Sequence, residues 1–435
     1  MKTMFLASTA LAFGVLAGAA NAATTVYGEG SSLATPTYNA EFGVYNPTNT
    51  AINLNEKSTS SGKGQAALLT NTGTASSGVP AGQTVYWAAS DSYVDSSFQA
   101  SWNSSDLATN GQFIQIPMLG TPIAIPFKNN VNTVYAPANA LNVATTLVLT
   151  DADVCGIFSG KITNWANTAG GSFEHAAGAI TVNYRADNSG TSFLFTQHLA
   201  KVCTAGTDGG VFTGKAPSQT FANFFGGTPV VSGKTTSIDP TRIPVGAKFV
   251  GNSGSGGVAG AINGQASAIG YLSPDFTGVA SAPAVTYALP VASMTNAQSK
   301  RNYQPTIGAT TIALANAGAG STNPLAPTTL AAAQNQLSWV PALPIVNDGY
   351  PIVGYTNWLL PTCFKTPAIA SALQGFLFKH FTGQYNTQIS SGGFTTVNYN
   401  NYNAAIKNNF LTDQTGYHLT IQSPRVCGGS GYVGR

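Results

Sequence analysis

Short apolar runs alternate along this chain with segments whose apolar positions recur at helical spacing. Strand-like runs cover residues 24–27, 85–89, 113–117, 123–127 and 180–184. Helical patterns cover residues 33–42, 65–69, 151–158, 191–202 and 368–381. Strands that alternate with helices predict an α/β architecture. Two stretches, 205–250 and 300–340, interrupt this pattern, and we interpret them as polar insertions rich in Gly, Pro and Ala.

The low content of charged residues argues against a disordered protein and against a nucleic-acid-binding protein. Charged residues make up 8% of the 435 positions, against roughly 25% in an average soluble domain. A hydrophobic content of 43% is enough for a sizeable core, and this length favours two domains. A net charge of +3 is too small to drive disorder. The Arg residues are scattered along the chain, so no nucleic-acid partner is expected; they are Arg185, Arg242, Arg301, Arg425 and Arg435.

The N-terminus has the pattern of a signal peptide over residues 1–22. Lys2 is followed by an apolar, small-residue run over 5–19, and Ala20-Asn21-Ala22 forms an A-x-A cleavage site. The alternative, a membrane anchor, needs 18 or more apolar residues and no cleavage signal. No Cys follows the cleavage site, which argues against a lipid anchor. We therefore expect a mature protein that starts at Ala23 and is periplasmic or secreted.

Four cysteines fit an oxidising compartment. They are Cys155, Cys203, Cys363 and Cys427, and four cysteines allow three pairings. Pairing neighbours, 155 with 203 and 363 with 427, is our prediction, and each bridge would contribute roughly 3–4 kcal/mol in the chain-entropy account. The alternative, a zinc site, requires closely spaced cysteines, which are absent from this sequence.

Three segments share one design, in which a strand is followed by a turn of small hydroxyl residues and then a helix. They are Ser31-Ser32, Ser60-Ser61-Gly62 and the run Arg185-x-Asp187-x-Ser189-Gly190-Thr191. A helix N-terminus offers unpaired N–H groups and partial positive charge, which suit an anion. Ordinary helix capping also explains each Ser-Gly turn taken alone. The third segment is sharper, because Arg185 can grip an oxyanion through two hydrogen bonds while Asp187 orients the guanidinium.

Together these segments resemble the phosphate-binding proteins of bacterial ABC transporters, and the DING proteins in particular. The stretches that carry the resemblance are 28–33, 60–64, 89–92, 114–126, 158–165, 185–191, 268–271 and 349–357. The last stretch is similar to the secreted branch that includes proteins called alkaline phosphatase L. One departure is Ala34, where the family usually has Pro. The resemblance covers nearly the whole mature chain apart from the two insertions.

The resemblance implies a type II periplasmic-binding-protein fold, with a ligand cleft between two lobes joined by two crossover strands. The crossings are expected near 120–126 and 268–272. One lobe would comprise residues 23–120 and 273–435, and the other residues 121–272. Carried over by position, the phosphate ligands would be Ser32, Leu33 (through its backbone N–H), Ser61, Asp91, Arg185, Ser189, Gly190 and Thr191. Whether Ser60 or Ser61 points inward stays open, because Lys63-Gly64 can be aligned in two ways.

Asp91 needs a physical reason to face a bound anion. A carboxylate can accept a hydrogen bond from the proton that phosphate still carries at neutral pH. Sulfate carries no such proton, so two acceptors would face each other. Asp91 would thereby favour phosphate, because its carboxylate would repel bound sulfate.

The competing hypothesis is a secreted phosphomonoesterase of the alkaline phosphatase L type. Two-metal hydrolysis needs clustered carboxylate and His ligands, but His175, His198, His380 and His418 are dispersed and no G-x-S-x-G elbow occurs. An adhesive protein would be supported only by the Asn-, Thr- and Gly-rich composition. We therefore expect a monomeric binder of inorganic phosphate without cofactor or metal, and an ABC phosphate transporter is its candidate partner.

Overall fold

The structure is a computed structural model in which thirteen stretches of the chain are described. They are residues 23–49, 51–73, 78–129, 147–169, 178–232, 235–281, 288–315, 327, 329–340, 345–397, 402–412, 419–427 and 433–435. The signal peptide expected over residues 1–22 lies outside the described residues. No helix of the described part is long and apolar enough to cross a membrane.

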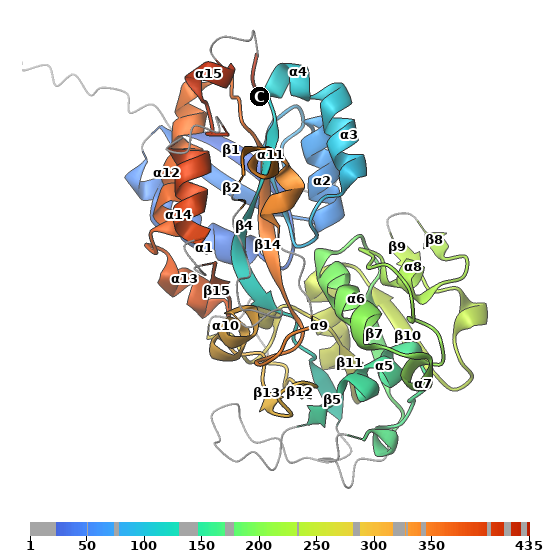
Figure 1. Ribbon diagram of the computed structural model, residues 1–435. Coiled ribbons are helices and arrows are strands. Elements are labelled where there is room, and N and C mark those ends of the chain that lie inside the picture. The colour runs from blue at the N-terminus through green and yellow to red at the C-terminus, as the bar shows by residue number, and fades with distance from the viewer. Residues whose placement is uncertain are drawn as a thin grey trace, which may run out of the picture.

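A six-stranded sheet forms the centre of the first lobe, in the order β15-β4-β14-β3-β1-β2. Its strands are β1 (Thr24–Gly30), β2 (Ile52–Ser58), β3 (Val85–Ser90), β4 (Phe113–Pro122), β14 (Val353–Pro361) and β15 (Thr395–Thr396). β1 pairs in parallel with β2 and β3, whereas β14 runs antiparallel to β3 and β4. The upper body in Figure 1 shows helices on both sides of this sheet. They are α1 (Thr35–Tyr45), α2 (Ser61–Thr70), α3 (Ser96–Ser105), α4 (Leu107–Asn110), α12 (Pro367–Phe381), α13 (Asn386–Ser391), α14 (Tyr402–Ile406) and α15 (Pro424–Cys427).

The core of the first lobe is built from aromatic rings. Trp358 on β14 stacks on Trp87 of β3 and on Phe376 of α12, with ring centroids 5.1 Å apart in both pairs. All three side chains are fully buried. These rings fix α12 against the sheet, because large aromatic side chains bury more apolar area than any others.

A four-stranded sheet, in the order β10-β7-β11-β5, forms the second lobe. Its strands are β5 (Phe127–Asn129), β7 (Thr181–Arg185), β10 (Lys248–Asn252) and β11 (Ser267–Gly270). The helices around it are α5 (Asp151–Ser159), α6 (Gly190–Val202), α7 (Ala205–Asp208), α8 (Phe221–Phe225) and α9 (Gly254–Gly264). A small hairpin, β8 (Val230–Ser232) with β9 (Thr235–Ser237), extends from this lobe at the right of Figure 1.

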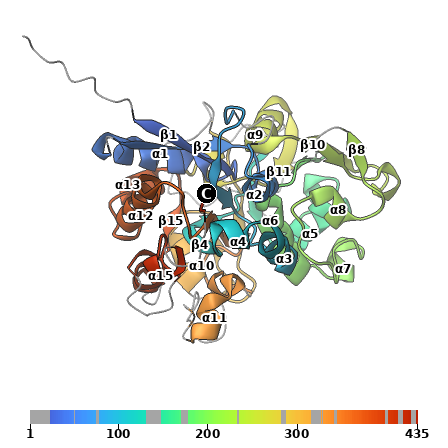
Figure 2. The same ribbon diagram turned by 90° about the horizontal axis from the view of Figure 1, so that it is seen from above.

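Two stretches of chain run side by side between the sheets, in the regions expected for the crossings. Ala124 and Leu272 exchange two backbone hydrogen bonds of 2.8 and 3.0 Å in an antiparallel bridge. Nearby, a three-stranded sheet pairs β6 (Val148–Leu149), β12 (Ser293–Thr295) and β13 (Asn302–Tyr303). The remaining helices are α10 (Ile307–Ala315) and α11 (Leu330–Gln334). In the view from above in Figure 2, the sheet of the first lobe and the helices α5–α9 of the second lobe lie on opposite sides of the molecule. The lobe boundaries at 120/121 and 272/273 stay a prediction.

Two expectations from the sequence pattern are wrong in part. The strand expected over 123–127 is not continuous. Only Phe127 belongs to a strand, β5, while Ala124 and Pro126 form isolated bridges, and Pro126 has no N–H with which to continue a ladder. The stretch 205–250 is not simply a polar insertion, because it supplies four buried rings to the second lobe. These are Phe212, Phe221, Phe224 and Phe225.

Both predicted disulfides are present. Cys155 of α5 is bonded to Cys203 at the end of α6, and Cys363 after β14 is bonded to Cys427 at the end of α15. No free cysteine remains. The first bridge joins two helices of the second lobe, and the second ties the C-terminal segment back to β14.

Candidate anion-binding site

Helix N-termini from both lobes meet between the two sheets. α1 and α2 begin there in the first lobe, after the ends of β1 and β2. α6 and α9 begin there in the second lobe, after β7 and β10. Their first N–H groups have no partner within the helix, and each helix start carries partial positive charge. The meeting point is therefore suited to a small anion.

The first lobe contributes a carboxylate held by two serines. The Ser31 hydroxyl donates to Asp91 Oδ1 at 2.5 Å and accepts from the backbone N–H groups of Leu33 and Ala34 at 3.1 and 3.3 Å. The Ser61 hydroxyl donates to Asp91 Oδ2 at 3.4 Å and accepts from the Asp91 N–H at 3.0 Å. These hydrogen bonds hold the Asp91 carboxylate just after β3. The side chain is almost completely buried.

Burial raises the pKa of Asp91 from its ordinary value to about 6. Hydrogen bonds from Ser31 and Ser61 and the positive charge of Arg185 oppose this shift. A carboxyl group with this pKa changes its protonation state close to neutral pH. A change in the charge or hydrogen bonds around Asp91 therefore alters the fraction of the carboxyl group that is protonated.

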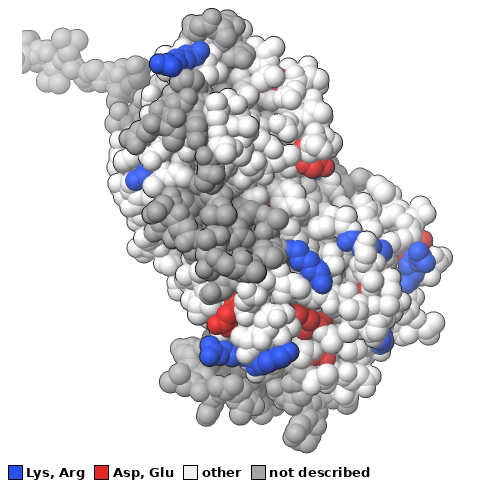
Figure 3. Space-filling model, in the orientation of Figure 1, with Lys and Arg blue, Asp and Glu red and all other residues white. Residues whose placement is uncertain are grey.

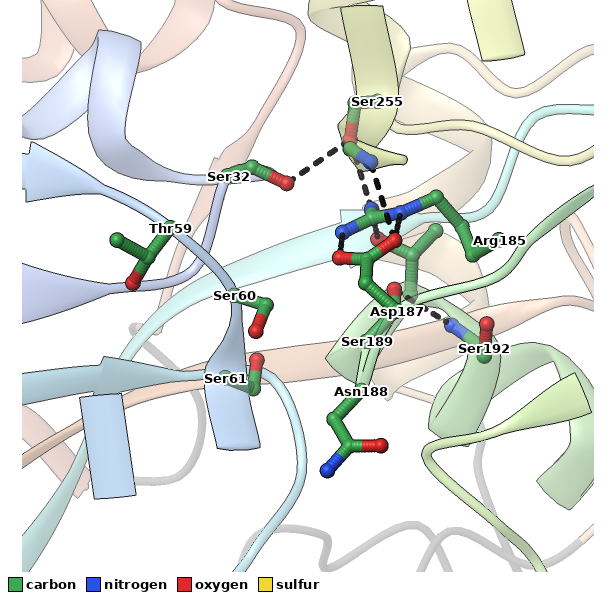
Figure 4. A network of polar contacts seen from close by, with 12 residues as sticks. Ser32, Thr59, Ser60, Ser61, Arg185, Asp187, Asn188, Ser189, Ser192 and Ser255 are labelled. Carbon is green, nitrogen blue, oxygen red and sulfur yellow. Dashed lines mark hydrogen bonds and ion pairs between the residues drawn. The ribbon is translucent and has the colours of Figure 1, made fainter. Parts of the chain in front are cut away.

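The two candidate serines of the second turn have different roles. Ser60 is the N-cap of α2, where its hydroxyl accepts from the Lys63 N–H at 3.4 Å. Ser61 is the residue whose hydroxyl reaches Asp91. Figure 4 shows both side chains at the start of the same helix. The geometry therefore favours Ser61 as the inward-facing residue.

The second lobe contributes a fully buried guanidinium. Arg185 ends β7, and its Nε and Nη2 donate to the two carboxylate oxygens of Asp187 at 2.8 and 2.5 Å. Its Nη1 lies 3.5 Å from Thr191 Oγ1 on α6. The Tyr271 hydroxyl accepts from the Arg185 backbone N–H at 3.1 Å and lies 2.7 Å from Ser192 Oγ. Tyr271 thus ties β7 to α6.

The ion pair keeps both partners charged despite burial. Burial alone would lower the pKa of Arg185, but the charge and hydrogen bonds of Asp187 raise it overall. Burial opposes ionisation of Asp187 as well, yet Arg185 and the Gly254 N–H hold the pKa of Asp187 below its ordinary value. Asp187 therefore holds the Arg185 guanidinium through two hydrogen bonds, and its role in orienting Arg185 toward a ligand stays a prediction. Because Asp187 uses Nε and Nη2, Nη1 is directed elsewhere.

The start of α6 lies directly against the first lobe. A Cβ added at Gly190 would fall 2.6 Å from Asp91 Oδ2 and would also overlap Ser61 Oγ. A Cβ at Gly62 of α2 would fall 2.8 Å from Asn188 Cβ. Only glycine allows this approach, because real Cβ atoms need more than 3 Å. Ser189 caps α6 by accepting from the Ser192 N–H at 3.2 Å.

The structure brings together every site residue expected from the sequence, and all of them are buried. They are Ser32, Leu33, Ser61, Asp91, Arg185, Asp187, Ser189, Gly190 and Thr191. Which of them contact a ligand stays a prediction at this point.

Three residues of this region were missed by the sequence analysis. The Gly254 N–H donates to Asp187 Oδ1 at 3.0 Å, and Ser255 Oγ lies 3.0 Å from Arg185 Nη1. Gln219 reaches the first lobe, where its Nε2 donates to Ser92 Oγ at 2.9 Å and to Gln65 Oε1 at 3.1 Å. The run Ser253-Gly254-Ser255-Gly256-Gly257 has the same strand, Ser-Gly turn and helix design as the other segments, so this signal was available.

Elsewhere in the described part of the chain, charged side chains form separate ion pairs, such as Arg435 with Asp106 at 2.8 Å. On the face shown in Figure 3, Lys, Arg, Asp and Glu lie in isolated patches among uncharged residues. Within the described part of the chain, no three His, Cys, Asp or Glu side chains are grouped so that they could hold a metal ion. His198 pairs with Asp151 at 2.9 Å and His380 with Glu41 at 2.6 Å. His175 and His418 lie outside the described residues.

Comparisons with known proteins agree with this architecture. A family model described as PBP superfamily domain matches residues 17–377. "Alkaline phosphatase L" of Pseudomonas aeruginosa is 29% identical over 388 residues, which cover 85% of this chain and 86% of that protein. A "Phosphate-binding protein" from an unknown prokaryotic organism is 30% identical over 391 residues, which cover 85% of this chain and 91% of the relative.

Solved structures show the same fold over nearly the whole chain. A periplasmic phosphate-binding protein (PfluDING) bound with phosphate superposes with a TM-score of 0.73 at 26% identity, over 95% of this chain and 99% of that one. An ancestral soluble variant of the human phosphate binding protein gives a TM-score of 0.73 at 28% identity, with the same coverage. The chain therefore belongs to the PBP superfamily and has the two-lobed α/β fold of the DING and phosphate-binding proteins.

Proposed function

We propose that this protein binds inorganic phosphate between its two lobes. The observation that carries the proposal is the opposition of Asp91 and Arg185, both buried, at a point where helices from both lobes begin. Helix starts and Arg185 would supply N–H donors and positive charge. The relatives named as phosphate-binding proteins support the same ligand.

The assignment of ligands follows the site geometry. Hydroxyl donors would come from Ser32, Ser189 and Thr191, and from Ser61 once its proton turns from Asp91 Oδ2 to the anion. Backbone N–H donors would be Gly190, the first residue of α6, and Leu33 in the turn before α1, whose N–H lies 3.1 Å from Ser31 Oγ in this structure. Arg185 Nη1 is the guanidinium nitrogen that Asp187 leaves unoccupied. Asp187 would act through Arg185 rather than on the anion.

Asp91 would read the protonation state of the anion. A phosphate that carries a proton can donate it to the Asp91 carboxylate. Sulfate has no proton to offer and would meet a negative acceptor, so its binding would require Asp91 to take up a proton first. Asp91 would therefore favour phosphate over sulfate most strongly above the pKa of about 6.

We propose a binder rather than an enzyme. Hydrolysis of a phosphoester would need a base beside a nucleophile or a pair of metal ions. Ser61 donates to the Asp91 carboxylate, which in this proposal accepts the proton of the anion instead, and Ser189 accepts from the Ser192 N–H. None of these described bonds involves a histidine. The name of the Pseudomonas aeruginosa relatives keeps a phosphomonoesterase as the alternative, but the site geometry does not favour it.

The remaining parts of the proposal concern location and partners. The A-x-A site at residues 20–22 supports export to the periplasm or beyond. We propose a monomer with lobes 23–120 plus 273–435 and 121–272, not anchored to a membrane and not bound to nucleic acid. An ABC phosphate transporter would be the partner that accepts the ligand.

The test is the loss of binding in Arg185→Ala. Truncating a buried, charge-assisted contact costs on the order of 2–5 kcal/mol, which corresponds to a loss of roughly 30-fold or more in phosphate affinity. Arg301→Ala is the matched control. Arg301 is 71% exposed, and the distance of 3.7 Å to its partner Asp348 is that of a loose ion pair. Equilibrium titration of phosphate-stripped protein should show the loss in the first variant alone. Equal affinities in both variants would contradict the proposal.

A further inference from the structure

Ser255 lies between the two lobes and touches both. It is the second residue of α9 and is only 1% exposed. Its Oγ is 3.0 Å from Arg185 Nη1 in its own lobe and 3.2 Å from Ser32 Oγ in the first lobe. Figure 4 shows dashed contacts from Ser255 to both residues. One hydroxyl therefore connects the guanidinium to the turn that precedes α1.

The chemistry of the guanidinium fixes the direction of one of these bonds. A guanidinium can only donate, so Ser255 Oγ accepts from Arg185. Between Ser255 and Ser32 either hydroxyl can be the donor, and Ser32 Oγ is the acceptor described for the Ser255 proton. When Ser255 donates, Ser32 accepts and its own proton is available for a third partner. No other hydrogen bond is described for the Ser32 side chain, which is 8% exposed.

We propose that Ser255 is a positioning residue that turns the proton of Ser32 toward the bound anion. This inference rests on the proposed phosphate function. The chain runs from Arg185 N–H to Ser255, from Ser255 O–H to Ser32, and from Ser32 O–H to the anion. Each donor in such a chain polarises the next one, so the last hydroxyl becomes a better donor.

The same bond couples the anion site to closure of the cleft. Ser255 and Ser32 belong to different lobes, so their hydrogen bond forms only when the lobes are closed. Its loss should therefore leave the capture of the anion unchanged and speed its release. Most affinity changes within one binding site appear in the dissociation rate, and a closed-state bond is an extreme case.

The experiment compares Ser255→Ala with Ser253→Ala in phosphate-stripped full-length protein. Ser253 is an exposed residue of the same turn, and its side chain makes no capping hydrogen bond. Stopped-flow measurement of phosphate release should show dissociation about tenfold faster in Ser255→Ala, the cost of a hydrogen bond within a charged network. The association rate should stay within about twofold of the wild type. Ser253→Ala should match the wild type in both rates.

A second measurement separates positioning from simple structural support. Because Ser255 acts through Ser32, the losses in Ser255→Ala and Ser32→Ala should not add in the double variant. The melting temperature of the phosphate-free protein should differ little between Ser255→Ala and Ser253→Ala. Additive losses, or unchanged release in Ser255→Ala, would overturn this inference and leave phosphate binding intact. Absence of phosphate binding in the wild type would overturn both.

Discussion

Asp91→Asn should remove most of the preference for phosphate over sulfate. In the proposed site, sulfate would be accommodated only after Asp91 takes up a proton, and burial raises the pKa of Asp91 to about 6. At about pH 8 this protonation costs about 2.7 kcal/mol, since each pH unit above the pKa costs about 1.36 kcal/mol. An Asn amide can donate without taking up a proton. Sulfate affinity should therefore rise by up to about a hundredfold in the variant at about pH 8.

The assay is competition of sulfate against phosphate across a pH series. Wild-type sulfate affinity should increase about tenfold for each pH unit between about pH 8 and pH 6, and level off below the pKa of Asp91. Asp91→Asn should show no such slope, and the two proteins should converge near pH 5. Asp95→Asn is the control, because Asp95 is an exposed N-cap of α3 and Asn caps equally well. The same slope in Asp91→Asn would show that Asp91 is not the group whose protonation controls sulfate binding.

Three further results are expected. Gly190→Ala should weaken phosphate binding strongly while folding is retained, because its Cβ would fall 2.6 Å from Asp91 Oδ2 when the lobes close; titration and circular dichroism separate the two effects. Asp275→Asn should stabilise the phosphate-free protein increasingly from about pH 4 upward. Burial raises the pKa of Asp275 well above its ordinary value, so the native state holds a proton that the unfolded chain releases, and wild-type stability is lost as pH rises. Urea unfolding of both proteins at two pH values measures this difference in stability. The same difference at both pH values would contradict the prediction. Intact protein should show no free thiol when denatured, and reduction should lower its stability by roughly 3–4 kcal/mol per bridge.

Local signals in the sequence located the three hydroxyl-rich turns of the candidate site, whereas Leu33 and Asp91 came from the family resemblance. The run from Arg185 to Thr191 contains a strand end, a salt bridge between residues two apart, and a helix cap, all within seven consecutive positions. Each of these features depends on neighbours in the sequence. The same holds for the Ser60 cap of α2, whose turn was expected to precede a helix, although α2 begins at Ser61 and the predicted helical pattern covered only 65–69.

Contacts that depend on the pairing of distant strands could not be predicted in this way. Ser255 reaches Arg185 because β10 pairs in parallel with β7, with Asn252 opposite Arg185, so the turns after both strands lie side by side. That register follows from the packing of the whole second lobe. The average composition of 205–250 likewise hid its aromatic residues, among them Phe221, which the fold buries beneath α6 and Tyr271.

The most direct test of phosphate binding is calorimetry on phosphate-stripped protein, titrated separately with inorganic phosphate, sulfate and an aryl phosphomonoester. We expect one phosphate bound per chain at neutral pH, much weaker binding of sulfate, and no hydrolysis of the ester above background. Failure to bind phosphate would show that the proposed function is wrong. So would ester turnover that survives repurification and falls in parallel with binding in Arg185→Ala, because the same cleft would then be catalytic.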